Sequence, residues 1–126
     1  MSGPGSAPEE TPLVTAILPA WNAEAFVDEM LEALAAQTWP ALEILIGDDA
    51  STDGTPAKLR AFAAEHPNVR LVLRERNLGW IGNTNDLMAR AKGEFLFFAF
   101  HDDWVAPSYV ERLARALVAE PRAVLA

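Results

Sequence analysis

The sequence of 126 residues contains no cysteine, and this absence excludes disulfide scaffolds, cysteine-ligated zinc sites and thiol catalysis. Basic residues are few: 10 Lys and Arg stand against 18 Asp and Glu, which gives a formal net charge of −8. Proteins that bind nucleic acid need clustered basic side chains, so nucleic acid is not an expected partner. Long apolar runs are missing too. The longest, 95–100, is far short of the roughly 20 residues that span a bilayer, so we expect no transmembrane segment and a cytoplasmic location.

Residues 1–12 differ in composition from the rest of the chain. They combine Gly, Ser, Pro and acidic residues with almost no bulky apolar side chains, and such a composition does not offset the entropy lost on ordering. We therefore expect a disordered N-terminal arm over 1–12 and one folded domain over 13–126. A domain of this size buries roughly two-thirds of the surface of its unfolded chain, which is enough for a hydrophobic core.

Strand and helix patterns alternate along 13–126. Apolar runs predict strands over 13–18, 42–47, 69–73 and 95–100, and helical periodicity predicts helices over 25–37, from 55 onward, over 81–91 and over 108–120. In this prediction Pro19 ends the first strand, Phe26 belongs to the buried stripe of the first helix, and Thr55 caps the second helix ahead of Pro56. The unbroken apolarity of 95–100 is typical of strands covered on both faces. The pattern predicts an α/β fold, an open and mostly parallel sheet with helices on both faces.

Residues 123–126 resemble the start of a fifth strand that is not completed. We therefore expect the chain to be a fragment, or the first half, of a longer protein. The sheet edge left bare near Ala126 would then allow self-association.

Polar and aromatic residues follow each predicted strand, at 19–22, 48–51, 74–79 and 101–104. Ligands of parallel α/β sheets bind beyond the carboxyl ends of the strands, where these segments meet. Two carboxylates about 4 Å apart repel by roughly 4 kcal/mol at an effective dielectric near 20, and a divalent cation removes that penalty. Oxygen ligands in a chain without cysteine favour Mg²⁺ or Mn²⁺.

The remaining side chains of these segments suit a nucleotide. Trp21 offers a face on which a base can stack, and Asp49 offers an acceptor for a ring N–H. Asn22, Ser51 and Asn77 supply neutral groups for sugar hydroxyls. Together with the carboxylates, they predict a nucleotide-diphosphate site with a metal.

Each of these residues also has a purely structural interpretation. Those interpretations are a turn or cap for Asp48 and Asp49, a helix cap for Asp102 and Asp103, the core for Trp21 and an ordinary loop histidine for His101. The functional prediction therefore depends on the combination and not on any one residue.

Several blocks of the sequence resemble the opening of family 2 glycosyltransferases. They are VTAILPAWNAE at 14–24, QTWP at 37–40, EILIGDDASTDGT at 43–55, NLG at 77–79, Asn85, AKGEF at 91–95 and HDD at 101–103. Their order and spacing match, and the resemblance covers 13–126. It implies a GT-A fold that binds a nucleotide-diphospho-sugar donor with Mn²⁺ or Mg²⁺ and transfers the sugar to an acceptor, of unknown identity here, with inversion.

The resemblance also implies roles for particular residues. The implied donor-binding residues are Pro19, Ala20, Trp21, Asn22, Glu24, Asp49, Ser51, Asn77, Gly79, Asn85, His101, Asp102 and Asp103. Within this set Trp21 stacks on the base, Asp49 binds it, and Asp102 and Asp103 reach the metal as part of a DxD-like motif. Phe100 replaces the first Asp of that motif, and His101 is expected to substitute for it in part. The catalytic base is expected outside this chain.

Two other interpretations compete with a glycosyltransferase. A non-catalytic module that binds a sugar nucleotide or a partner protein is compatible with Phe100 and with the missing base. A phosphoacceptor receiver domain has a similar length and alternation, but it needs an Asp after its third strand, where this chain has Leu73 and Arg74.

Overall fold

The computed structural model describes residues 11–99 and 105–119. In chain order the elements are β1 (Val14–Ala20), α1 (Val27–Ala35), β2 (Leu42–Asp48), α2 (Thr55–Glu65), β3 (Val69–Leu73), α3 (Gly79–Arg90), β4 (Phe95–Phe98) and α4 (Tyr109–Ala119). The strands form one four-stranded sheet in the order β3-β2-β1-β4, and every pair is parallel. The predicted α/β fold with a parallel sheet is therefore confirmed.

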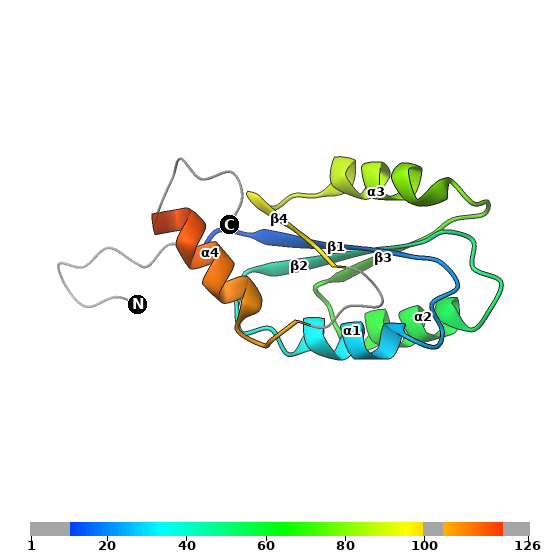
Figure 1. Cartoon of the computed structure of the whole chain (residues 1–126), viewed down its shortest axis with the longest axis horizontal. Coiled ribbons are helices and arrows are strands. Elements are labelled where there is room, and N and C mark those ends of the chain that lie inside the picture. Colours follow the sequence, from blue (N-terminus) through cyan, green and yellow to red (C-terminus); the bar gives the residue numbers. More distant parts are fainter. Residues whose placement is uncertain (1–10, 100–104, 120–126) are drawn as a thin grey trace.

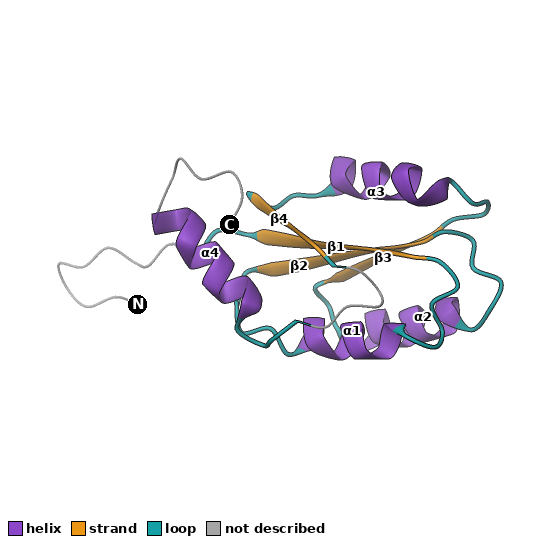
Figure 2. Ribbon diagram, viewed as in Figure 1, coloured by secondary structure: helices purple, strands orange, loops and turns teal. Residues whose placement is uncertain are grey.

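The helices cover both faces of the sheet, as predicted. Helices α1 and α2 lie on one face, α3 lies on the other, and α4 packs near the end where β1 begins (Figure 1). The loops that follow β1, β2 and β3 gather at the opposite end of the sheet (Figure 2). The topology thus brings the polar segments after these three strands to one edge.

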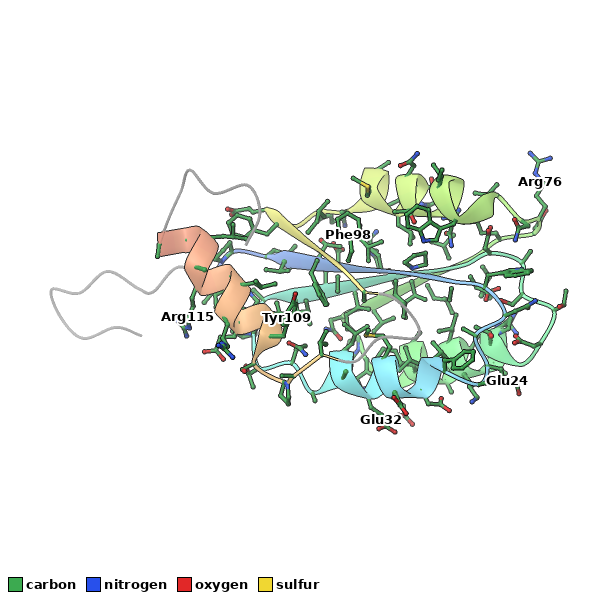
Figure 3. All side chains as sticks on the ribbon, viewed as in Figure 1. Glu24, Glu32, Arg76, Phe98, Tyr109 and Arg115 are labelled. Atoms are coloured by element: carbon green, nitrogen blue, oxygen red, sulfur yellow. The ribbon has the colours of Figure 1, made fainter. Side chains whose placement is uncertain are left out.

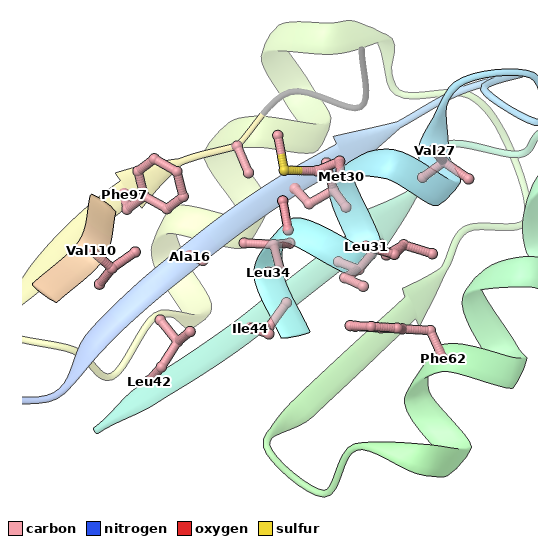
Figure 4. Close-up of a cluster of buried hydrophobic side chains, with 14 of the residues drawn as sticks. Ala16, Val27, Met30, Leu31, Leu34, Leu42, Ile44, Phe62, Phe97 and Val110 are labelled. Carbon is pink, nitrogen blue, oxygen red and sulfur yellow. The ribbon is translucent and has the colours of Figure 1, made fainter. Parts of the chain in front are cut away.

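Two apolar clusters hold these layers together. The larger one joins the sheet to α1, α2 and α4, and it includes Met30 and Leu34 of α1 and Val110 of α4 (Figure 4). The smaller one joins Ile17 and Leu45 of the sheet to Leu87 of α3. Every residue of β1 is buried, because this strand lies inside the sheet and is covered on both faces.

The strand at 95–100 differs from the prediction. It pairs only over Phe95–Phe98, at an edge of the described sheet, and Leu96 and Phe98 are 39% and 42% exposed. Unbroken apolarity therefore did not mean burial on both faces here: Leu96 and Phe98 share the exposed face, while Phe97, on the other face, packs in the larger apolar cluster.

Several predicted boundaries were also wrong. Strand β1 continues through Pro19, opposite Gly47 of β2. The carbonyl of Ile17 accepts a hydrogen bond from the Ala99 amide at 2.8 Å, so Ile17 and Pro19 both face the β4 side. Pro19 has no amide proton to donate toward the β4 side, and the described pairing of β1 with β4 ends before it, at Ile17 opposite Phe98.

Helices α1 and α2 begin differently from the prediction. Phe26 precedes α1 and is 54% exposed, outside the buried stripe. Thr55 is the first residue of α2 and Gly54 precedes it, so Thr55 is not the cap. Instead, Oδ1 of Asp53 accepts hydrogen bonds from the Thr55 hydroxyl at 2.6 Å and the Thr55 amide at 2.9 Å. The hydroxyl bond is the main reason why the pKa of Asp53 is lowered.

The predicted arm over 1–12 lies mostly outside the described residues, and the predicted strand start at 123–126 lies wholly outside them. Self-association through that edge therefore stays a prediction. Within 11–99 and 105–119, no helix combines the length and the apolar character needed to cross a membrane.

Candidate functional site

A cleft of about 700 Å³ opens where the loops after β1, β2 and β3 meet. It is lined by Pro19, Ala20, Trp21, Asp49, Ala50, Thr52, Asn77, Gly79, Trp80 and Asn83. Most predicted site residues of the described chain therefore face one hollow. A smaller groove of about 240 Å³ runs between β4 and α4, and its lining is almost entirely apolar.

Trp21 stands at the cleft on the loop after β1 and is 52% exposed. Its interpretation as an ordinary core residue was therefore wrong. Ala20, directly before it, is held by a hydrogen bond from the Asp49 amide to the Ala20 carbonyl at 2.9 Å. The sheet thus fixes the base of the loop, while the indole itself remains available to a ligand.

Asp49 lies at the carboxyl end of β2 and is only 3% exposed. Its Oδ1 accepts a hydrogen bond from the Leu78 amide at 2.7 Å, and its carbonyl accepts one from Nδ2 of Asn77 at 3.0 Å. Oδ2 makes no hydrogen bond with any residue that the structure describes. The carboxylate therefore ties the β3–α3 loop to β2 through one oxygen, and Asp49 is among the residues that line the cleft.

Asp48 has a different role from its neighbour. Its Oδ1 accepts a hydrogen bond from the Ser51 hydroxyl at 2.6 Å and its Oδ2 accepts one from the Ser51 amide at 3.0 Å. Both carboxylate oxygens are thus used within the turn, as the structural interpretation of Asp48 predicts. Each carboxylate of the Asp48–Asp49 pair is thus held by hydrogen bonds to the protein.

Three predicted residues lie behind the cleft and do not line it. Oγ of Ser51 accepts a hydrogen bond from the Asn22 amide at 2.9 Å, and Oδ1 of Asn22 accepts one from the Thr52 amide at 2.8 Å. Glu24 accepts a hydrogen bond from the Gly54 amide at 2.9 Å through Oε1. These bonds fasten the β1–α1 loop to the β2–α2 loop, so Asn22, Glu24 and Ser51 shape the cleft from outside.

The β3–α3 loop is equally well fixed. Oδ1 of Asn77 accepts a hydrogen bond from the Gly79 amide at 2.8 Å, and Gly79 has a φ of +83°, a conformation that favours glycine. In Figure 3, Arg76 on this loop points away from the sheet. Arg76 is not among the residues that line the cleft.

Sequence reasoning missed Asn83, which lines the cleft and is 1% exposed. Its Nδ2 donates to the Gly47 carbonyl at 2.9 Å, and its Oδ1 accepts from Nε of Arg74 at 3.0 Å. Asn85, the predicted residue of this helix, is exposed and is not part of the lining. The helical period was the available signal, because Asn83 lies four residues before the buried Leu87.

An ion-pair network supports Asn83 from behind. Nη1 of Arg74 lies 2.8 Å from Oδ2 of Asp86, and Nε of Arg90 lies 2.8 Å from the same oxygen. Hydrogen bonds from Arg90 and Arg74 lower the pKa of Asp86 against a smaller opposing effect of burial. Asp86 therefore stays charged and holds Arg74 against Asn83.

His101, Asp102 and Asp103 lie outside the described residues. The described chain reaches Ala99, whose hydrogen bond to Ile17 puts the end of β4 beside β1. Among residues 11–99 and 105–119, no group of three or more His, Asp or Glu side chains is placed to hold a metal ion. The predicted metal ligands therefore stay a prediction from the sequence.

The chain is similar to a known protein family and to several known proteins. The family model described as glycosyl transferase family 2 matches residues 15–126. The putative glycosyltransferase EpsH of Bacillus subtilis is 34% identical over 106 residues, covering 84% of this chain and 30% of that protein. The chain thus spans about a third of the length of EpsH and of several other curated relatives that it matches.

Solved structures agree with this match. The mannosyltransferase PcManGT from Pyrobaculum calidifontis, in complex with GDP-Man and Mn²⁺, superposes with a TM-score of 0.78 at 31% identity, covering 87% of this chain and 33% of that one. Residues 1–349 of S. aureus TarS, in complex with UDP, give a TM-score of 0.77 at 30% identity, covering 86% and 32%. The chain belongs to glycosyl transferase family 2, so the resemblance seen in its sequence is confirmed.

Proposed function

We propose that the cleft of this family 2 chain binds the nucleotide of a nucleotide-diphospho-sugar, and that the chain is the donor-binding part of an enzyme that transfers the sugar to an acceptor. The observation that carries the proposal is the meeting of Trp21, Asp49 and the β3–α3 loop around one cleft at the carboxyl ends of the strands. The similar proteins solved with GDP-Man or UDP support a donor of this chemical class.

Two side chains would recognise the base. The half-exposed indole of Trp21 stacks on it, and Oδ2 of Asp49 accepts a hydrogen bond from a ring N–H. Burial of Asp49 strengthens such a bond, because water competes poorly for a carboxylate in a site of low dielectric. Pro19, Ala20, Asn77 and Gly79 complete the walls, and the predicted roles of Asn85 and His101 stay predictions.

Catalysis would rest on orientation and charge. Rigid loops hold the nucleotide so that the sugar keeps one position, which removes most of the entropy cost of reaching the transition state. We assign Asp102 and Asp103 as ligands of Mn²⁺ or Mg²⁺, from their residue types and their place after β4. When bound, such a cation supplies positive charge against the diphosphate.

The remaining parts of the proposal come from the family resemblance. Direct displacement at the anomeric carbon inverts its configuration, and the base that deprotonates the acceptor is predicted outside this chain. The cytoplasmic location stays a prediction from the sequence.

Calorimetric titration with UDP, GDP and dTDP, with and without Mn²⁺, tests the proposal. We expect at least one nucleotide to bind, and Trp21→Ala to weaken its binding by roughly 1–3 kcal/mol, because a stacked base loses its platform. Phe26→Ala is a matched control, since Phe26 is a similarly exposed aromatic residue on the same loop that does not line the cleft.

The outcomes separate the parts of the proposal. If no nucleotide binds, or if Trp21→Ala and Phe26→Ala behave alike, the cleft is not a donor site. If nucleotide binding is independent of Mn²⁺ and unchanged by Asp102→Asn, the metal assignment is wrong.

A further inference from the structure

A second indole, that of Trp80, lines the same cleft, and the proposed nucleotide contacts of Trp21 and Asp49 do not involve it. It is 61% exposed on the first turn of α3. An indole left this exposed forgoes the burial that stabilises most tryptophans, and large aromatic groups at a concave surface are typical of ligand sites. Trp80 therefore needs an explanation other than packing.

The two indoles reach the cleft from different elements. Trp21 lies on the loop after β1, Asp49 directly follows β2, and Trp80 lies in the first turn of α3, the helix that packs on β1 and β2. All three residues line one cleft of about 700 Å³. A flat ring in contact with an indole on each face needs about 7–8 Å between them. A cleft of this size, with an indole from each of two elements, therefore accommodates one base between the indoles.

The backbone that carries Trp80 is fixed by the proposed base-binding carboxylate. The Leu78 amide donates to Oδ1 of Asp49, and Nδ2 of Asn77 donates to the Asp49 carbonyl. Gly79, with its positive φ, then turns the chain into α3. Because this segment is ordered before any ligand arrives, little conformational entropy is lost when Trp80 makes a contact.

We propose that Trp80 forms the second aromatic wall of the nucleotide site, so that the base is held between the indoles of Trp21 and Trp80 with its edge toward Oδ2 of Asp49. This inference rests on the proposed function and adds a specificity-determining residue to it. A base is the flat aromatic part of a nucleotide-diphospho-sugar, and it matches two indole faces better than the diphosphate or the sugar does. Trp80 then contributes to affinity for the base and not for the phosphates.

The test measures dissociation constants of the nucleoside diphosphate and the nucleoside monophosphate of whichever base binds, among UDP, GDP and dTDP with their monophosphates. We expect Trp80→Ala to weaken both nucleotides by the same factor, about 5- to 100-fold, because each keeps the stacked base. Trp80→Phe should retain affinity within a few-fold. Ile81→Ala is the matched control, because Ile81 is the next residue of α3, is 66% exposed and does not line the cleft.

The outcomes decide whether Trp80 contacts the base. If Trp80→Ala weakens binding of the two nucleotides by the same factor while Ile81→Ala leaves their binding unchanged, Trp80 is the second aromatic wall. An unchanged affinity, or a loss confined to the diphosphate, overturns it while the proposed function stands. If the unaltered chain binds no nucleotide of the set, the proposed function fails and this inference fails with it. Because Trp80 is exposed, its removal should leave the unfolding midpoint nearly unchanged, and urea unfolding of each variant checks this.

Discussion

Replacing Gly47 by alanine is predicted to destabilise the fold for a reason that the structure shows directly. It lies in β2, where its carbonyl accepts a hydrogen bond from Nδ2 of Asn83 on α3. A Cβ added at Gly47 would collide with Oδ1 of Asn83 and would lie 3.1 Å from Cδ1 of Leu87. Oδ1 cannot simply swing aside, because Nε of Arg74 donates to it at 3.0 Å. Gly47→Ala must therefore displace Asn83 or shift α3.

The cost follows from the bonds that are lost. A hydrogen bond to a charged donor such as Arg74 contributes about 1.5–3 kcal/mol, and the neutral bond to the Gly47 carbonyl contributes about 0.5–1.5 kcal/mol. Allowing for partial relaxation, Gly47→Ala should lower the free energy of unfolding by about 2–4 kcal/mol. Domains are stable by about 5–15 kcal/mol in total, so this loss would be large.

Urea unfolding followed by circular dichroism measures the effect. If the free energy of unfolding depends on urea concentration with the same slope in both proteins, only stability differs. Gly82→Ala is the control. Gly82 lies within α3, where its added Cβ would approach Cβ of Leu78 to 3.2 Å, and the better helix propensity of alanine, worth about 0.5–1 kcal/mol, offsets that contact. We expect this variant to unfold close to the unaltered chain.

A double variant isolates the cause. In an Asn83→Ala background the Oδ1 obstacle is gone, so Gly47→Ala should cost much less than it does alone. The reasoning is refuted if Gly47→Ala leaves stability unchanged, or if its cost is the same in both backgrounds.

Three further predictions concern stability. The pKa of Asp86 is lowered by hydrogen bonds from Arg90 and Arg74, so the contribution of Asp86 to stability is fully present above a pH of about 3.8 and is lost as the pH falls through the folded-state pKa. Asp86→Asn should flatten this dependence of stability on acid pH. Identical pH profiles of the variant and the unaltered chain would contradict the prediction. Gly79→Ala should cost about 1–2 kcal/mol from its positive φ alone, since no atom lies within 4 Å of the added Cβ; a much larger loss in urea unfolding would mean that the loop rearranges. Leu87→Ala should cost about 2–5 kcal/mol, while Met88→Ala, at an exposed position of the same helix, should cost little; equal midpoints would place Leu87 outside the core.

The fold was largely predictable because its elements have strong local signals. Apolar runs ended by turn residues located β2 and β3 closely, and the four-residue spacing of Met30 and Leu34 identified the buried face of α1. Boundaries were less predictable, because they depend on partners. Pro19 stays in β1 because it pairs with Gly47 of β2, while its nitrogen faces the β4 side, where the described pairing ends at Phe98. No local pattern indicates this.

The candidate site was predictable in part. Parallel strands bring their carboxyl ends to one edge, so Trp21, Asp49 and Asn77 were expected to meet, and they do. The different hydrogen-bonding roles of Asp48 and Asp49 were not predictable, because the sequence alone does not distinguish two adjacent acidic residues in one turn. Only the loop that approaches each carboxylate distinguishes them: Ser51 occupies both oxygens of Asp48, whereas Leu78 occupies one oxygen of Asp49.

By itself the sequence determined the alternation of strands and helices, the parallel sheet and the family. Periodicity, turn residues and motif spacing are local features, so they can be recognised without knowing which residues contact one another. The tertiary structure decided which polar side chains face the cleft. Asn83 lines it and Asn85 does not, Trp80 lines it as Trp21 does, and Asn22, Glu24 and Ser51 hold its loops from outside. The physical reason is that a side chain's exposure to a cleft depends on how a helix is rotated against the sheet and on which backbone amides reach it, and both are settled only when the layers pack.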